Sequence, residues 1–454
     1  METVERFIDQ NRARYVTQLC DWLRIASIST DSKFKADVAR AAEFVASDLR
    51  GIGFRVEVFP TPGHPIVYAE WLNAPGQPTV LVYGHYDVQP PDPLDLWVTA
   101  PFEPTERDGN LFARGATDDK GQLFTHVKSV EAWLKTEGKL PINVKFLIEG
   151  EEECGSTNLD AFIRSNKERL RCDNVVISDC SQFAPGVPAI TYGLKGLAYY
   201  EIFLTGPKQD LHSGMFGGAV ANPANNLASI IAALRDAKGR VQLHGFYDDV
   251  VPLADWERKQ FAELPFDEGS FKKFVGLDVL FGEEGYTTVE RKWARPTCDV
   301  NGLTSGYQGE GAKTIIPSRA SAKVSFRLVP NMDPLKVTAS FKQFVESRLL
   351  PGIQCEIREY GAGPAVLVSV DSPGVQAAAR AVETGFGKKP VFVREGGSIP
   401  VVGTFKRELG VDTLLLGWGQ NDDNLHSPNE KFSLADFHRG IRASACLWQE
   451  LVQR

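Results

Sequence analysis

Hydrophobic and polar positions follow two different patterns along this chain, and the first pattern opens the sequence. Apolar residues recur at helical spacing from Val4 to Leu23, which predicts a long amphipathic helix at the start. Apolar runs of strand length then alternate with helical stretches. The predicted buried strands are Thr79–Tyr83, Asn143–Ile148 and Val175–Ser178, and the helix predicted between them is Gln122–Leu134. This order is typical of βαβ units that build a mostly parallel sheet.

The pattern changes between Tyr192 and Gly196. Residues in Ala198–Leu204 and Ala322–Val329 alternate apolar and polar, as half-buried strands do, and helices are predicted at Pro223–Arg235 and Lys336–Leu349. After Asp371 the first pattern returns, with a helix at Gly374–Phe386, a strand at Asp412–Trp418 and a last helix from Leu434. We therefore predict an α/β domain built from residues 1–193 and 372–454, interrupted by an inserted α+β domain at 194–371.

Composition limits the class of protein. The 454 residues are 43% hydrophobic and 24% charged, with 50 Lys and Arg against 58 Asp and Glu, a formal net charge of −8. These proportions are ordinary for a globular protein, and the acidic balance disfavours nucleic acid and anionic membrane surfaces as partners. No apolar run approaches the roughly 18–20 residues of a spanning helix, and the start leads into no signal-type stretch. We expect a soluble, cytoplasmic protein with neither nucleic-acid nor membrane partners.

Acidic and imidazole side chains follow the three predicted strands. The first strand leads into His85 and Asp87, the second into the run Glu149–Glu153, and the third into Asp179. Because ligands bind outside the carboxyl ends of strands in open α/β sheets, we expect these side chains to meet in one crevice. Asp118 and His426, elsewhere in the chain, carry the same chemistry.

Such a density of carboxylates predicts bound cations, because the carboxylates would otherwise repel one another. Mixed imidazole and carboxylate ligands suit zinc, and a pair of metal ions can polarise a carbonyl and generate a hydroxide. We expect His85 to bind metal and Asp87 to support it. The glutamate run can supply both a ligand and a general base, but spacing alone leaves open which glutamate does which. Seven scattered cysteines with no Cys-x-x-Cys pair argue against a cysteine zinc site.

Several motifs together resemble a known family. They are the strings Gly84–Pro90, Thr117–Gly121, Glu152–Ser156, Asp210–Gly214, Gly311–Pro317, Arg327–Met332, Arg394–Pro400 and His426–Glu430. In this order they resemble the co-catalytic zinc metallopeptidases, the family of aminoacylase, glutamate carboxypeptidase and, most closely, the carnosine-type dipeptidases. The resemblance implies a split catalytic domain around an inserted ferredoxin-like dimerisation and lid domain. It also implies a homodimer that hydrolyses dipeptides with a free C-terminal carboxylate, through a metal-bridging hydroxide and a glutamate base.

The resemblance also implies a role for each matching residue. Two Zn²⁺ per subunit, with Mn²⁺ or Co²⁺ as alternatives, would be held by His85 and Asp179 on one side and by Glu153 and His426 on the other. Asp118 would bridge them and join Asp119 through a cis peptide, and Glu152 would be the base. The substrate residues would be His212, reaching across the dimer interface to the substrate carbonyl, and Arg327, Thr314, Gly396, Gly397 and Ser398. Glu151 departs from the family pattern, which often has an uncharged residue there, and could perturb the base.

Three other readings compete with this one. Aminoacylase or carboxypeptidase activity on N-acyl amino acids would use the same metal ligands. A metal-free binding or scaffold homologue would lack a ligand or the base, yet all five ligand positions and Glu152 are present. The stretch Gly306–Thr314 nearly spells a phosphate-binding loop, but its lysine stands one place late and precedes Ile315-Ile316-Pro317 instead of a helix.

Overall fold

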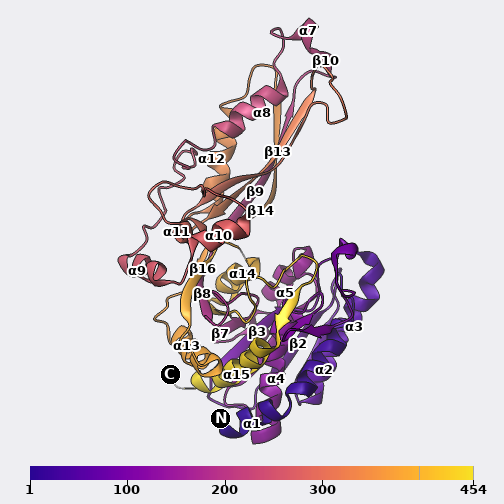
Figure 1. Cartoon of the computed structure of the whole chain (residues 1–454), viewed down its shortest axis with the longest axis vertical. Coiled ribbons are helices and arrows are strands. Elements are labelled where there is room, and N and C mark those ends of the chain that lie inside the picture. Colours follow the sequence, from indigo (N-terminus) through magenta and orange to yellow (C-terminus); the bar gives the residue numbers. More distant parts are fainter. Residues whose placement is uncertain (398, 453–454) are drawn as a thin grey trace. The chain divides into compact units, whose positions relative to one another are not determined.

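The computed structural model describes residues 1–397 and 399–452, and the chain divides into two compact units. The first unit comprises Met1–Tyr192, Val368–Val393 and Thr404–Arg454, and the second comprises Gly193–Leu367 and Arg394–Gly403. The predicted insertion therefore overlaps the second unit, which also includes a short segment from beyond residue 371. Figure 1 shows the elements of both units.

The first unit is built on a sheet in the order β1-β2-β6-β3-β7-β17-β8. The strands are β1 (Arg55–Phe59), β2 (Ile66–Trp71), β3 (Thr79–His85), β6 (Asn143–Glu149), β7 (Asn174–Ile177), β8 (Ala189–Leu194) and β17 (Asp412–Leu416). The four inner strands β6, β3, β7 and β17 run parallel, and the outer pairs are antiparallel. The predicted α/β fold with a parallel-sheet core is confirmed. Every residue of β6 and β7 is buried, which explains their unbroken apolar runs.

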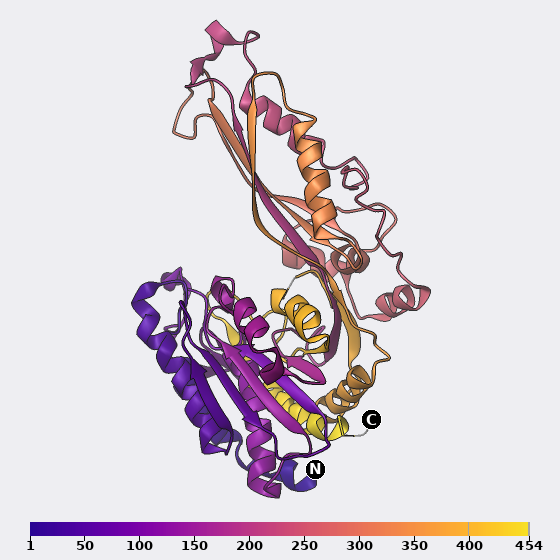
Figure 2. The same ribbon diagram turned by 180° about the vertical axis from the view of Figure 1, so that it is seen from behind.

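Helices flank this sheet (Figure 2). They are α1 (Glu2–Gln10), α2 (Arg12–Leu23), α3 (Lys35–Gly51), α4 (Lys120–Glu137), α5 (Leu159–Ser165), α6 (Lys167–Leu170), α13 (Pro373–Phe386), α14 (Pro400–Leu409) and α15 (Leu434–Glu450). The single long helix predicted at the start is wrong in one respect. The chain breaks into α1 and α2 at Asn11, whose side chain donates to the Phe7 carbonyl and accepts from Arg14, competing with the helix backbone.

The second unit is an antiparallel sheet with helices on one face. Its strand order is β11-β13-β9-β14, from β9 (Gly196–Thr205), β11 (Thr297–Ser305), β13 (Arg319–Leu328) and β14 (Gln354–Gly363). Helices α8 (Pro223–Ala232) and α12 (Pro334–Glu346) pack with alternate residues of β9 and β13 in one core. The predicted alternation of the two inner strands is confirmed. The edge strands β11 and β14 were not predicted, because both are largely exposed and neither carries a sustained apolar alternation.

Short elements extend from both ends of this second sheet. One end carries β10 (Leu211–His212), α7 (Ser213–Phe216) and β12 (Ile315–Ile316), and the other carries α9 (Asp255–Glu263), α10 (Glu268–Val275) and α11 (Thr288–Ala294) (Figure 1). The near-phosphate loop at 306–314 thus leads into a strand and not into the helix that a phosphate-binding loop needs.

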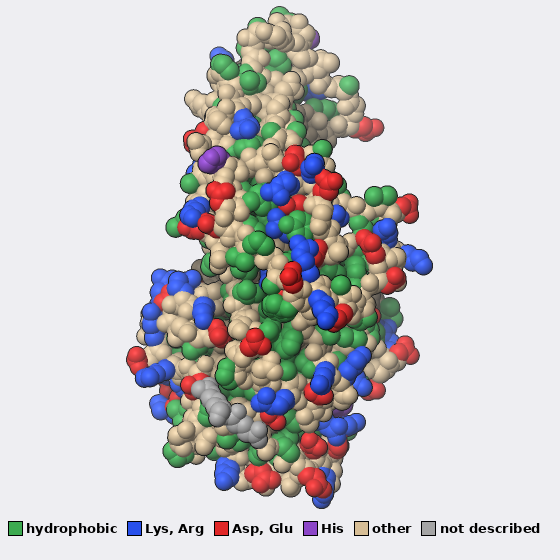
Figure 3. Space-filling view, turned by 90° about the vertical axis from the view of Figure 1, so that its left-hand side faces the viewer, with side chains coloured by type: hydrophobic (Ala, Val, Ile, Leu, Met, Phe, Trp, Pro, Cys, Tyr) green, Lys and Arg blue, Asp and Glu red, His purple; other side chains and the backbone are tan. Residues whose placement is uncertain are grey.

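The surface and the helices add two observations. On the face drawn in Figure 3, acidic and basic side chains are interspersed. Among the helices of the described residues, none has the length and apolar character that a bilayer crossing requires.

Candidate active site

Three parallel strands of the first unit end at the same edge of the sheet. His85 ends β3 and pairs with Glu149, the last residue of β6, while Tyr83 pairs with Ile177, the last residue of β7. The chain leaves β6 into a single 3₁₀ turn, Glu152–Cys154, and leaves β7 into Asp179. The order of these strands in the sheet therefore brings together side chains that lie far apart in sequence.

The carboxylate of Asp118 lies between two imidazoles. Its Oδ1 is 3.1 Å from Nε2 of His85, and its Oδ2 is 3.0 Å from Nε2 of His426. His85, Asp118 and Asp179 have ligand atoms within 4.8 Å of one another, and so do Asp118, Glu153 and His426. Asp118 belongs to both groups, which is the arrangement that a shared, bridging ligand requires.

The donor set fits a pair of metal ions. Two imidazoles and three carboxylates are the mixed nitrogen and oxygen ligands that zinc accepts. Within the described residues, Nε2 of His85 is buried and has no hydrogen-bond partner, because its contact with Asp118 lacks hydrogen-bond geometry. A metal ion bound by this nitrogen and by the neighbouring carboxylates would satisfy them together.

The electrostatics of the cluster support the same interpretation. Burial and the charge of Asp118 raise the pKa of Glu153 to about 8 and that of Asp179 to about 7. Burial also raises the pKa of Glu152. Burial opposes ionisation of Asp118 as well, but its hydrogen bond with His426 and the positive charges of His85 and His426 outweigh burial and lower its pKa. Without cations, therefore, part of the cluster holds protons near neutral pH.

Neighbouring groups hold His85 in place. Its Nδ1 lies 3.1 Å from the Asp87 carbonyl oxygen and 3.4 Å from Oδ1 of Asp87, while Oδ2 of Asp87 accepts from the backbone N–H of Glu153. Oδ2 of Asp119 accepts from the backbone N–H of His85, and the Asp118–Asp119 peptide is cis, as the resemblance implied. Asp87 thus ties an imidazole of one group to a glutamate of the other.

Glu151 is occupied elsewhere. Its carboxylate accepts two hydrogen bonds from Nδ2 of Asn158, at 3.0 and 2.8 Å, and one from the backbone N–H of His64. Gly63 provides the room, since a Cβ there would lie 1.7 Å from Oε1 of Glu151. After burial, the strongest influences on the pKa of Glu152 are His85 and Asp118. Glu151, the residue that departs from the family pattern, therefore anchors the glutamate turn to its surroundings.

Sequence reasoning missed a buried clamp around Glu430, which is fully buried. Its carboxylate accepts from the backbone N–H groups of Gly115, Thr117 and Asp118 at 2.9–3.0 Å, and from Nη1 of Arg114 at 2.8 Å. Because Glu430 follows His426 by four residues, the clamp joins the loop of one ligand to the loop of another. Gln89, which donates to Oε2 of Glu153 at 2.7 Å, was also missed. Both residues stand inside the quoted motifs, and only this position in a motif could have signalled them.

The proposed substrate residues lie in the second unit, in two places. His212 pairs with Ile315 between β10 and β12, and the Thr314 carbonyl accepts from the backbone N–H of Ser213, so His212 and Thr314 are neighbours. Both are exposed. Arg327, near the end of β13, lines a cavity together with Gly396. Gly397 is exposed beside it in sequence, and Ser398 lies outside the described residues.

The chain is similar over its whole length to known proteins. It is 34% identical to the Cys-Gly metallodipeptidase dug1 of Schizosaccharomyces pombe, over 100% of this chain and 98% of that protein. It is 32% identical to the human Beta-Ala-His dipeptidase, over 100% of this chain and 93% of that protein. Among solved structures, an M20 family metallo-carboxypeptidase from Sulfolobus solfataricus is 36% identical, with a TM-score of 0.88, covering 97% of this chain and 99% of that chain.

These relatives align with nearly the whole length of the chain. The model of the Peptidase family M20/M25/M40 matches residues 81–450, which include both groups of candidate metal ligands. A member of this metallopeptidase family binds metal, and the clustered donors of the first unit are where this chain can do so. The chain belongs to the Peptidase family M20/M25/M40.

Proposed function

We propose that this protein is a dipeptidase that holds two Zn²⁺ ions per subunit, with Mn²⁺ or Co²⁺ as alternatives. The main support is the position of Asp118, which lies between His85 and His426 and belongs to both ligand groups. One ion would be held by His85, Asp118 and Asp179, and the other by Asp118, Glu153 and His426. The similarity to two dipeptidases supports the choice of substrate, and we propose the cytoplasm as its location.

In this proposal, Glu152 is the general base. When bound, the metal pair would polarise the scissile carbonyl and acidify a water molecule. The Glu152 carboxylate would take a proton from the attacking water as its oxygen adds to the carbonyl carbon, and would return a proton to the amine nitrogen as the C–N bond breaks. Its raised pKa moves this carboxyl toward the neutral range in which a proton is both taken and returned. Asp87 would keep His85 oriented.

Residues of the second unit would recognise the peptide. Arg327 would bind the free C-terminal carboxylate, for which a guanidinium offers two parallel donors. His212 would donate to the substrate carbonyl, with Thr314 beside it and Gly396, Gly397 and Ser398 lining the pocket.

The dimensions of the second unit support a homodimer. Asp210, two residues before His212, accepts a hydrogen bond from Ser318, the residue before β13. His212 therefore lies near the end of β13 that begins with Arg319. Arg327 stands eight residues further along, roughly 27 Å at the rise of an antiparallel strand. A dipeptide spans only about 7 Å. His212 and Arg327 of one chain therefore cannot hold one dipeptide, whereas a partner subunit can supply the His212.

The test of the proposal is Glu152→Gln. We expect turnover of a dipeptide such as Ala-Gly to fall at least about a thousandfold while bound metal, measured by elemental analysis, is retained. Glu137→Gln is the matched control, because it makes the same change at an exposed position at the end of α4 and should keep near wild-type turnover. A Glu152→Gln enzyme that turns over at the wild-type rate would refute the assignment of the base.

A carboxypeptidase is the second candidate, because the Sulfolobus relative is a metallo-carboxypeptidase. An aminoacylase-like activity would use the same residues. Rates for dipeptides, for longer peptides and for N-acetyl amino acids, measured on one preparation, separate the three. A metal-free binding homologue would be favoured only if the purified protein carried no tightly bound divalent metal.

A further inference from the structure

A cavity of about 370 Å³ in the second unit is lined by an excess of positive charge. It lies where β9, β11 and β13 meet the loop before α11. Its cationic side chains are Lys195, Arg235, Arg291, Lys292, Arg295 and Arg327. Among the described residues that line it, only Glu283 and Asp299 are acidic. A cavity with this balance of charge attracts anions.

One of the two acids is already shared between arginines. Glu283 accepts from Nε and Nη2 of Arg295 at 2.7 and 2.8 Å, and from Nη1 of Arg240 at 2.7 Å. The other, Asp299, is exposed. Asp299 also acts electrostatically on Lys195 and Arg327. Six cationic side chains therefore face two carboxylates, one of which is already paired with Arg240 and Arg295.

Two of the lining cations are buried, Lys195 with 3% and Arg295 with 5% of the surface exposed, and Arg295 is paired with Glu283. Nζ of Lys195 donates to the Arg291 carbonyl at 3.1 Å. Burial and the neighbouring Arg327 guanidinium lower the pKa of Lys195 to about 7. Burial also lowers the pKa of Arg327. Two cations that disfavour each other at a buried site are stabilised together by an anion placed between them.

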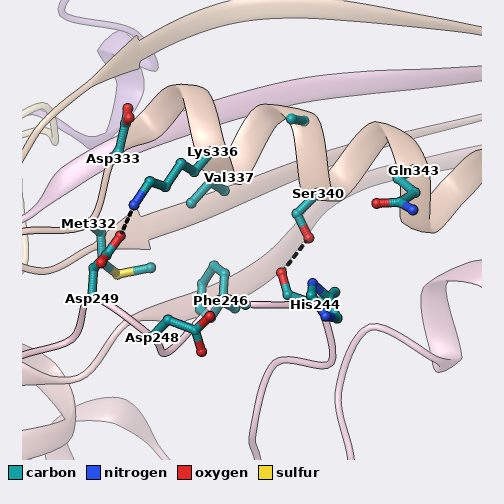
Figure 4. Close-up of a pocket in the computed structure, with 12 residues that line it drawn as sticks. His244, Phe246, Asp248, Asp249, Met332, Asp333, Lys336, Val337, Ser340 and Gln343 are labelled. Carbon is teal, nitrogen blue, oxygen red and sulfur yellow. Dashed lines mark hydrogen bonds and ion pairs between the residues drawn. The ribbon is translucent and has the colours of Figure 1, made fainter.

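A second cavity, lined by described residues of the same unit, does not share this excess of positive charge. This second cavity, of about 410 Å³, lies between α12 and the loop at 244–249 (Figure 4). It is lined by Asp248, Asp249 and Asp333, and its one lysine, Lys336, pairs with Asp249 at 2.6 Å. That cavity offers no comparable attraction to an anion.

The size of the Lys195 cavity points to more than one carboxylate. A water molecule occupies about 30 Å³ of liquid, so 370 Å³ exceeds the space of one carboxylate group several times over. We propose that the cavity receives an acidic C-terminal residue of the substrate, with its α-carboxylate on Arg327 and its side-chain carboxylate on Lys195. The preferred substrates are then dipeptides that end in Asp or Glu. This inference rests on the proposed dipeptidase function.

The test compares Ala-Glu with Ala-Gln, which differ at the C-terminal side chain by its charge. A hydrogen bond to a charged group is worth about 1.5–3 kcal/mol, so we expect the wild-type enzyme to prefer Ala-Glu by at least about tenfold in kcat/KM, mainly through KM. Lys195→Met should reduce the ratio of kcat/KM for Ala-Glu to that for Ala-Gln to about one, while Lys195→Arg should keep the wild-type ratio. Lys323→Met, an exposed lysine on β13 outside the cavity, is the control and should behave as wild type.

Two outcomes would overturn the inference. One is equal hydrolysis of Ala-Glu and Ala-Gln by the wild-type enzyme, which would leave the dipeptidase proposal intact. The other is an equal loss for both substrates in Lys195→Met. Binding of glutarate and of its monoamide, measured by calorimetry on the full chain, gives a readout without turnover. Wild type and Lys195→Arg should bind glutarate at least about tenfold more tightly than its monoamide, whereas Lys195→Met should bind the two alike. Equal binding of glutarate and its monoamide to wild type would refute the second carboxylate contact, even if no dipeptide is hydrolysed.

Discussion

The candidate metal ligands of the first unit and the proposed substrate residues of the second unit are built in opposite ways. His85 is fully buried and Asp118 is 8% exposed, and each donates a backbone hydrogen bond to a carboxylate distant in sequence. His212 and Thr314 are exposed on two-stranded β10–β12 and the loop beside it. Metal ligands must be placed before the metal arrives, since a loosely held set loses affinity. Groups that bind a small peptide can instead be completed by the peptide and a partner subunit.

The largest effect on metal binding is expected when the Glu430 clamp, which holds the loops of the candidate metal ligands, is weakened. Glu430→Gln removes the charge that holds Arg114 and weakens the bonds that place Asp118. Metal affinity, measured by competition with a chelator, should fall about 10- to 100-fold. Asp422→Asn, an exposed carboxylate nearby that pairs with Lys431, is the control and should bind metal normally. Unchanged affinity in Glu430→Gln would mean that the ligands do not depend on the clamp.

A change of pH should alter metal affinity less than the Glu430 variant does. Glu153 and Asp179 have raised pKa values of about 8 and about 7 in the metal-free protein, so both hold protons at pH 6 and lose them by pH 8.5. Because metal binds the deprotonated carboxylates, affinity should rise about tenfold or more from pH 6 to pH 8.5, with more protons released at the lower pH. Calorimetry in buffers of different ionisation enthalpy counts those protons. An affinity that is flat over this range would show that the carboxyls are already ionised.

His212 should give the smallest effect on metal binding and a large one on turnover. His212→Ala removes an exposed side chain of the second unit, so metal affinity should stay within about twofold and the melting temperature within about 2 °C. Dipeptide turnover should fall at least about a hundredfold. Mixing His212→Ala with Glu152→Gln chains should restore activity, because a mixed dimer contains one complete site. If mixing restores nothing although chains exchange, His212 does not act across the interface.

Local sequence patterns predicted the strands that lead into the candidate site. The strands before His85 and Asp179 are buried on both faces, so their apolar runs are unbroken and their ends are easy to recognise. Exposed edge strands such as β11 lack that signal, and the break at Asn11 depends on one side chain competing with the backbone. The clamp could not be predicted from spacing either, because Glu430 and Arg114 are 316 residues apart and nothing local marks them as partners.

The sequence by itself determined the types of donor, their order and the family, because these are carried by short strings that stay intact at any distance. Only the tertiary structure decided which donors meet. It placed Asp118 between His85 and His426, bound the carboxylate of Glu151 to Asn158, and gathered Lys195 and Arg327 around one cavity. The physical reason is that these contacts depend on strand order and on loop closure over hundreds of residues. A linear pattern of polar and apolar positions does not record either one.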